Sequence, residues 1–219
     1  STPVAYDIHG SNMLGFGVVK LDPSTGAPLW TRLSNATLHY NGNPIDPELE
    51  NYHSTYGSAW IRDSLSIDDS GSITFSYNAQ DYDSGTYDMG LMFAGMEIPT
   101  DSSCTQSNGA VSSRVSAGVI RLSPQGEPEW LVDASPMNGS SCTSWNWDYY
   151  LGNAAVSSSY PGDARTVSTA HPDGTVSLAV PFRGNVSIGG VIVDGNNLTD
   201  GSYSLAIARI SPVSYTHLR

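Results

Sequence analysis

Apolar and polar residues alternate over two short stretches of the chain, and each stretch has the period of a β-strand. Residues 73–77 read ITFSY and residues 176–180 read VSLAV, so every second side chain is apolar. Successive side chains of a strand point to opposite faces of a sheet, and this pattern therefore predicts two strands with one buried face each. Gly71 and Gly174 precede the stretches in Ser-Gly and Asp-Gly pairs, which are typical of tight turns. No window has a sustained helical stripe with caps, so we expect an all-β protein.

A heptapeptide pattern occurs three times in the chain. Residues 17–23 read GVVKLDP, residues 118–124 read GVIRLSP and residues 206–212 read AIARISP. The whole chain has nine Lys and Arg, yet three of them take the same position of the motif: Lys20, Arg121 and Arg209. Chance rarely produces such a coincidence, so the chain is a tandem repeat and has to be interpreted unit by unit.

Each unit is expected to contain about four short strands. The first two motifs are followed by Gly and then by Trp30 or Trp130, which recur at one position and are expected to be packing residues. The alternating strand comes later in the unit, and a further apolar stretch leads back to the next motif. Four antiparallel strands repeated in series are the plan of a β-propeller blade. We therefore expect tandem four-stranded antiparallel blades, with units at about 15–113 and 114–205 and a third unit that begins at 206.

Long insertions separate the expected strands. The motif copies are 101 and 88 residues apart, about twice the forty to fifty residues of a compact blade. The extra residues fall at about 34–62, 134–165 and 100–113, where we expect loops that build out one face of the array. A closed propeller needs at least about four blades. Two blades and the start of a third therefore predict one partial propeller domain over 1–212, a fragment of a longer protein.

The last seven residues have an unusual sequence. Val213 to Arg219 read VSYTHLR, which resembles the translated end of an adapter used to prepare sequencing libraries. We expect 213–219 to be a non-native tail and exclude it from the interpretation of the fold.

The charge balance narrows the classes of partner. With 21 Asp and Glu against nine Lys and Arg, the formal net charge is −12. Nucleic acids and anionic membrane surfaces require a basic footprint, so neither is expected as a partner. No apolar stretch approaches the roughly eighteen residues that cross a bilayer, so we expect no membrane insertion. A charged fraction of 14% with abundant Ser, Thr, Asn and Tyr is typical of an extracellular or cell-surface β protein.

Two features would follow from secretion. Cys104 and Cys142 lie in Ser-rich insertions and are the candidates for a disulfide. The alternative is two unrelated thiols that never come within bridging distance. Sequons for N-linked glycans occur four times, and we expect the first two to lie in exposed loops because they come just after the Trp strands. The four sequons are at Asn35, Asn138, Asn185 and Asn197.

The chain has no recognisable catalytic motif. Neither a G-x-S-x-G elbow, an S-x-x-K pair nor an H-E-x-x-H helix occurs, so we expect no catalytic residue and no cofactor. Asp81, Asp83 and Asp88 in DYDSGTYD offer hard oxygen ligands of the kind that Ca²⁺ prefers. The pattern lacks the closing Glu of an EF-hand, which favours a solvated hairpin and leaves calcium as the alternative.

Aromatic residues gather in the second insertion. Trp145, Trp147, Tyr149 and Tyr150 lie in the sequence SWNWDYY. Aromatic loops with few charges bind sugars or protein partners, and they equally form the small core that packs a long insertion onto its blade. Both interpretations stay open at this point.

The repeat is similar to a known family. KLDPSTGAPLW at 20–30 and RLSPQGEPEW at 121–130 resemble the bacterial β-propeller repeats of the SBBP and quinoprotein-like (PQQ-like) type, and DGTVSLAVPFRG at 173–184 resembles their inner strands. The resemblance covers most of both units except the insertions. It implies a propeller fold and a binding or scaffold role outside the cell. In the quinone-dependent dehydrogenases of this type the Trp docks one blade on the next, so the resemblance implies no cofactor.

Three functions are compatible with these features. The first is a secreted or cell-surface β-propeller that serves as a binding or scaffold module for a protein or glycan partner. The second is part of a propeller enzyme, either a quinoprotein dehydrogenase or a glycan-active hydrolase, with active residues along a central channel. The third is the subunit of an extracellular filament that self-associates through blade edges. The repeat, the acidic surface and the sequons favour the first.

Overall fold

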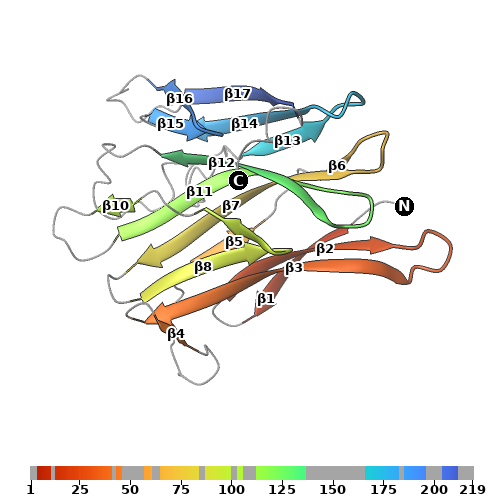
Figure 1. The fold of residues 1–219 in the computed structure, drawn as a ribbon, viewed down its shortest axis with the longest axis horizontal. Helices are drawn as coiled ribbons and strands as arrows, with labels where there is room; N and C mark the ends of the chain where they lie inside the picture. The colour runs from red at the N-terminus through yellow and green to blue at the C-terminus, as the bar shows by residue number, and fades with distance from the viewer. Residues whose placement is uncertain are drawn as a thin grey trace, which may run out of the picture.

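The protein is built from β-strands. The computed structural model describes residues 4–10, 13–40, 43–45, 57–60, 65–83, 87–99, 103–105, 112–136, 166–182, 185–195 and 204–211, and these residues form strands and turns without a helix. Neighbouring strands run antiparallel (Figure 1), apart from a parallel bridge between Leu14 and Ser58. The expected all-β class with antiparallel sheets is therefore confirmed.

The described strands are numbered in the order in which they occur along the chain. They are β1 (Val4–Gly10), β2 (Met13–Leu21), β3 (Pro28–Tyr40), β4 (Asn43–Ile45), β5 (Gly57–Trp60), β6 (Ser66–Ile67), β7 (Ile73–Asp83), β8 (Tyr87–Phe93), β9 (Met96–Ile98), β10 (Ser103–Thr105), β11 (Ser112–Leu122), β12 (Pro128–Pro136), β13 (Val167–Ala170), β14 (Val176–Phe182), β15 (Asn185–Ile188), β16 (Val191–Asp194) and β17 (Ser204–Ile210).

The repeated heptapeptide forms the same hairpin twice. In the first copy β2 pairs with β3, and in the second copy β11 pairs with β12. Lys20 is the register partner of Trp30, and Arg121 is the register partner of Trp130. Each ladder has an irregularity directly after the cation. The sequence repeat is therefore also a structural repeat.

The turns of the two units are equivalent as well. The turn at 68–72, before β7, closes with a hydrogen bond between its end residues of 3.1 Å, and the turn at 171–175, before β14, closes in the same way at 2.8 Å. The β8–β9 turn at 94–95 and the β15–β16 turn at 189–190 both have positive φ at two successive residues. Positive φ at both central residues is typical of a type I′ turn, whose twist matches that of a hairpin.

The strands of one repeat unit are divided between two neighbouring groups of paired strands, which we call layers. The expected grouping of each unit into one blade is therefore corrected. The motif strand β11 of the second unit pairs with β7 of the first, and the motif strand β17 pairs in the same way with β14. The fourth strand of each unit pairs with the strand that contains the Trp of the same unit. In the first unit β8 pairs with β3, and in the second unit β15 pairs with β12. Sets of four neighbouring strands are therefore drawn from two consecutive units.

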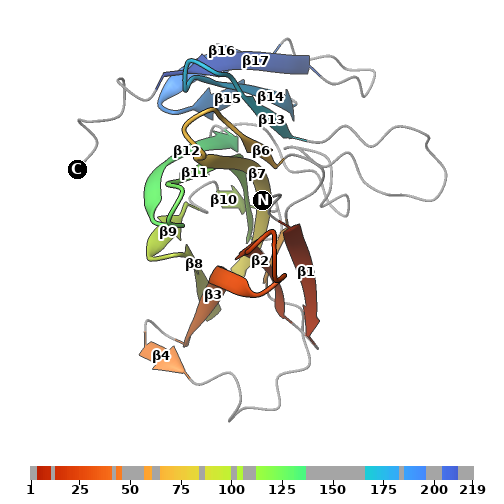
Figure 2. The same cartoon turned by 90° about the vertical axis from the view of Figure 1, so that its right-hand side faces the viewer.

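Three layers of strands enclose two apolar cores (Figure 2). The first layer holds β2, β3, β8 and β9, the second holds β7, β11 and β12 with the β15–β16 hairpin, and the third holds β13, β14 and β17; β5 joins the first two into one bent sheet. Phe16, Phe75 and Phe93 lie between the first and second layers with ring centroids 4.8–5.9 Å apart. Strand β11 is buried on both faces, because Val119 lies in the core toward the third layer and Ile120 in the core toward the first.

Parts of the expected insertion loops are strands. The end of β3, together with β4 and β5, falls within 34–62, and β10, within 100–113, pairs with the start of β11. Pairing supplies partners for the backbone N–H and C=O groups of these segments. Residues 137–165 and the tail at 213–219 lie outside the described residues, so the expectations for them stay predictions.

Candidate functional site

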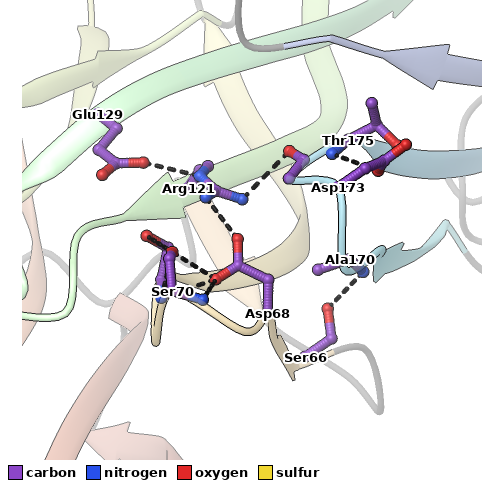
Figure 3. A network of polar contacts seen from close by, with 10 residues as sticks. Ser66, Asp68, Ser70, Arg121, Glu129, Ala170, Asp173 and Thr175 are labelled. Carbon is purple, nitrogen blue, oxygen red and sulfur yellow. Dashed lines mark hydrogen bonds and ion pairs between the residues drawn. The ribbon is translucent and has the colours of Figure 1, made fainter.

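Arg121 is a charged residue in the interior of the protein. It lies near the end of β11, and 7% of its side chain is exposed. Its guanidinium donates to acceptors from three segments (Figure 3): Asp68 Oδ2 at 2.5 Å, Glu129 Oε2 at 2.7 Å and the carbonyl of Gly174 at 3.4 Å. A buried charge is costly unless it is paired and hydrogen-bonded, and these acceptors meet that need.

Asp68 is held in place by the turn that it begins. Its Oδ1 atom accepts hydrogen bonds of 2.6–3.1 Å from Ser70 N, Ser70 Oγ and Ser72 N, which leaves Oδ2 for Arg121. Burial raises the pKa of Asp68, but the hydrogen bonds from Ser70 and Arg121 and the charge of Arg121 outweigh burial, so the pKa lies below its usual value. The carboxylate therefore stays ionised at neutral pH and serves as a counter-ion, not as a proton donor.

The polar cluster around Arg121 joins the second layer to the third. Gly174, one of its three acceptors, lies in the turn that leads into β14 of the third layer. A second buried hydrogen bond connects the same layers, from Ser76 Oγ of β7 to the carbonyl of Thr166 at 2.8 Å. The donors and acceptors named here bond to one another, so the arrangement fits a cross-link between layers.

Lys20, the cation of the first motif, also bonds a turn of the next unit. Its Nζ atom donates to the carbonyl of Pro124 at 2.8 Å, and Nε1 of Trp30 donates to the same carbonyl at 3.2 Å. Pro124 lies in the turn between β11 and β12. The first hairpin therefore holds the turn of the second.

Trp30 and Arg32 complete this contact at Gly126. A Cβ atom on Gly126 would lie 2.7 Å from the Trp30 ring, so glycine alone leaves room for the indole. Arg32 donates through Nε to the carbonyl of Gly126 at 2.8 Å and pairs with Glu127 Oε1 at 2.6 Å. Trp130, the equivalent of Trp30, packs against the core between the second and third layers.

Arg209, the cation of the third motif, bonds the turn before β14. Its Nη2 atom pairs with Asp173 Oδ2 at 2.8 Å, and its Nε atom donates to Thr175 Oγ1 at 3.1 Å, on the exposed surface. Hydrogen bonds from Thr175, with the charge of Arg209 as a smaller cause, lower the pKa of Asp173. All three motif cations therefore bond a turn distant in sequence. Sequence reasoning missed this role, although an Asp in each of the two turns was a visible signal.

Two of the four sequons lie on described strands. Asn185 is the first residue of β15 and is exposed. Asn35 lies inside β3, where it is the register partner of Met92. The expectation that Asn35 lies in a loop is therefore wrong, because β3 continues beyond the Trp hairpin to pair with β8. Asn138 and Asn197 lie outside the described residues.

The other candidates are placed in part. Cys104 is the middle residue of β10, whereas Cys142 lies outside the described residues, so the disulfide stays a prediction. The aromatic group lies outside the described residues as well, so its binding role also stays a prediction. That group consists of Trp145, Trp147, Tyr149 and Tyr150.

The aspartates proposed for calcium do not lie on a hairpin. Asp81 and Asp83 end β7, which pairs with β11, whereas Asp88 belongs to β8, which pairs with β3. The expected hairpin is therefore corrected to a connection between two layers. Among the side chains that the structure describes, no three of His, Cys, Asp or Glu gather into a group able to hold a metal ion. Within the same part of the chain, no helix is long and apolar enough to cross a bilayer.

Comparison of the chain with models of protein families, with curated proteins and with solved structures found no match.

Proposed function

We propose that this chain is a binding and scaffold module of a secreted or cell-surface repeat protein of the β-propeller type. The observation that carries the proposal is that one motif position supplies a cation to a distant turn in all three copies. These cations are Lys20, Arg121 and Arg209. The repeated cations therefore have a structural role, which is what a scaffold requires.

A long segment follows β12 in the sequence, and this segment is the proposed contact region. Binding residues are often carried by loops that a rigid framework positions. The segment 137–165 connects β12 of the second layer to β13 of the third and contains the aromatic group of four. Aromatic side chains offer a large apolar area with a polar end, which suits a glycan or a protein surface. We therefore assign partner contact to this segment.

An extracellular location is part of the same proposal. The net charge of −12 disfavours contact with nucleic acid. The sequon at Asn185 is exposed, as an acceptor of an N-linked glycan has to be. Both features support a module that works outside the cell.

A binding and turnover experiment tests the proposal. The intact chain and a Trp145→Ala/Trp147→Ala variant are applied to glycan and extracellular-protein arrays, and the ligands that bind are then assayed for hydrolysis and for quinone-dependent oxidation. We expect binding that the double variant loses, without turnover. A matched Ile192→Ala variant, changed at an exposed apolar residue of β16, should bind as the intact chain does. Turnover of a bound ligand would contradict a non-catalytic module, and binding that survives the double substitution would move the contact region elsewhere.

A further inference from the structure

The outer face of the third layer is an exposed apolar surface. In β17 Leu205 is 63% exposed and Ile207 is 74% exposed. Val167 of β13 and Ala179 of β14 continue the row of Ile207, because Val167 pairs with Ala179 and Ala179 pairs with Ile207. We call these four residues the third-layer face.

The same positions of the second layer are buried by the next layer. Because Arg121 and Arg209 are equivalent, Ala117 is the equivalent of Leu205 and Val119 that of Ile207. Ala117 and Val119 are both fully buried in the core that the second layer shares with the third. This position of the motif strand is therefore built to be covered.

The first layer follows the same rule. Counted from Lys20, the equivalents of Leu205 and Ile207 are Phe16 and Val18. Both are buried in the core between the first and second layers. In two layers out of three these positions lie beneath the following layer, whereas on the third they face outward.

The opposite end of the molecule carries the complementary surface. Trp30 and Arg32 of β3 face the second layer, so the alternation of the strand turns Leu29 and Leu33 outward, and these are 55% and 52% exposed. Val19 of β2 also points away from the second layer, because side chains alternate along the strand and Phe16 and Val18 point toward that layer. We call Val19, Leu29 and Leu33 the first-layer face.

The first-layer face corresponds to the side on which each layer packs onto its predecessor. Ile120, the equivalent of Val19, is fully buried against the first layer, and Leu131 of β12 packs against the same core. In the third layer Ala206 and Ile210 are buried on this side. Leu29 and Leu33 take the places of Glu129 and Asp133 in the second layer, so the first-layer face lies on the side of the internal contacts and is more apolar there than the second layer.

We infer that a second copy of this chain stacks head-to-tail, with its first-layer face on the third-layer face of the first copy. Continuity with the two contacts between layers selects this occupant and its orientation, because both internal contacts join the same two sides. A head-to-tail contact is heterologous, so association continues into a stack or closes into a ring according to the rotation between layers. This inference goes beyond the proposed function and does not depend on it. It also differs from pairing through strand edges, since it buries side chains.

Three single substitutions test the contact. Ile207→Lys disables the third-layer face, Leu33→Lys disables the first-layer face, and Ile192→Lys changes an exposed apolar residue of β16 outside both. Sedimentation velocity over a concentration series measures the mass of each protein, and thermal unfolding verifies that each is folded. We expect the intact chain and Ile192→Lys to grow in mass with concentration. Ile207→Lys and Leu33→Lys should each lose more than about a hundredfold in association constant, because an unpaired ammonium group would be buried.

An equimolar mixture of the two face variants decides the orientation. Ile207→Lys keeps its first-layer face and Leu33→Lys keeps its third-layer face, so the mixture should form a dimer of one copy of each and nothing larger. This recovery also shows that both variants are folded. An intact chain that stays monomeric at the highest attainable concentration overturns the inference. Association that persists in either single variant, or a mixture that stays monomeric, overturns it as well.

Discussion

Arg121 and Asp68 form an ion pair of 2.5 Å inside the protein, with 7% and 2% of their side chains exposed. The pair joins a motif strand to a turn that lies 53 residues earlier in the chain. Arg209 and Asp173 form the corresponding contact in the third layer at 2.8 Å, but on the exposed surface. One repeat position therefore offers the same kind of ion pair in two environments.

The first prediction compares these two environments. Asp68→Asn keeps an acceptor for the turn but removes the charge opposite Arg121, which stays buried. Leaving a buried charge without any partner costs about 3–5 kcal/mol, but Glu129 remains paired with Arg121 in this variant and should reduce the loss. We expect Asp68→Asn to lower the free energy of unfolding by about 2 kcal/mol in urea denaturation. The matched Asp173→Asn variant should unfold as the unchanged protein does, since water screens the exposed pair; equal losses in both variants would contradict a role for burial.

The second prediction concerns acid. The pKa of Asp68 is lowered in the folded protein, so its contribution to stability is fully present above the pKa of the unfolded chain and is lost as the pH falls through the folded pKa. The stability difference between the unchanged protein and Asp68→Asn should stay constant from neutral pH to about pH 5 and shrink below about pH 4. Denaturant titrations at several pH values measure this difference. The lowered pKa values of Asp22 and Asp173 affect both proteins alike and cancel. A difference that grows on acidification would contradict the sign.

The third prediction separates backbone strain from side-chain contact at two equivalent glycines. Gly26 and Gly126 have φ of 72° and 81°, which is unfavourable for alanine by about 1–2 kcal/mol. A Cβ atom on Gly26 would meet nothing within 4 Å, whereas one on Gly126 would meet the Trp30 ring. Gly126→Ala should therefore lower the unfolding free energy by a further 1–3 kcal/mol or so relative to Gly26→Ala, because it overpacks the contact. Chemical denaturation followed by tryptophan fluorescence measures both; equal costs would show that Trp30 yields freely.

The fourth prediction concerns the exposed sequon. When the chain passes through a eukaryotic secretory pathway, we expect a glycan on Asn185, because this residue is exposed at the start of β15. Asn185→Gln should lower the mass of the secreted protein by one glycan, measured by intact-mass spectrometry before and after enzymatic deglycosylation. Ser187→Ala removes the hydroxyl that the sequon requires and should lose the same glycan, whereas the matched control Ser187→Thr keeps the sequon and should keep the glycan. If neither Asn185→Gln nor Ser187→Ala loses a glycan, the sequon is not used.

Local features of the fold were predictable. The alternation at 73–77 and 176–180 correctly predicted β7 and β14, and the Gly-containing pairs before them correctly predicted the turns. The heptapeptide correctly indicated equivalent elements, since both complete copies form hairpins of equal register. These features depend on neighbours a few residues away, so the order of residue types is enough to specify them.

The partners of the strands were not predictable in the same way. The pattern assigned β7 to the unit in which it occurs, whereas in the structure it pairs with β11 of the next unit. The use of Arg121 was missed for the same reason, because its partner Asp68 belongs to the preceding unit.

Periodicity, turn chemistry and the threefold motif thus specify an all-β repeat, because each rests on local backbone preferences and on which side of a strand is apolar. Which strands pair, which motif cation is buried and which apolar faces stay open depend on the packing of three layers. The type of an apolar residue does not reveal whether another layer will cover it. Val119 is buried because the third layer lies over it, whereas Ile207 of the third layer is exposed.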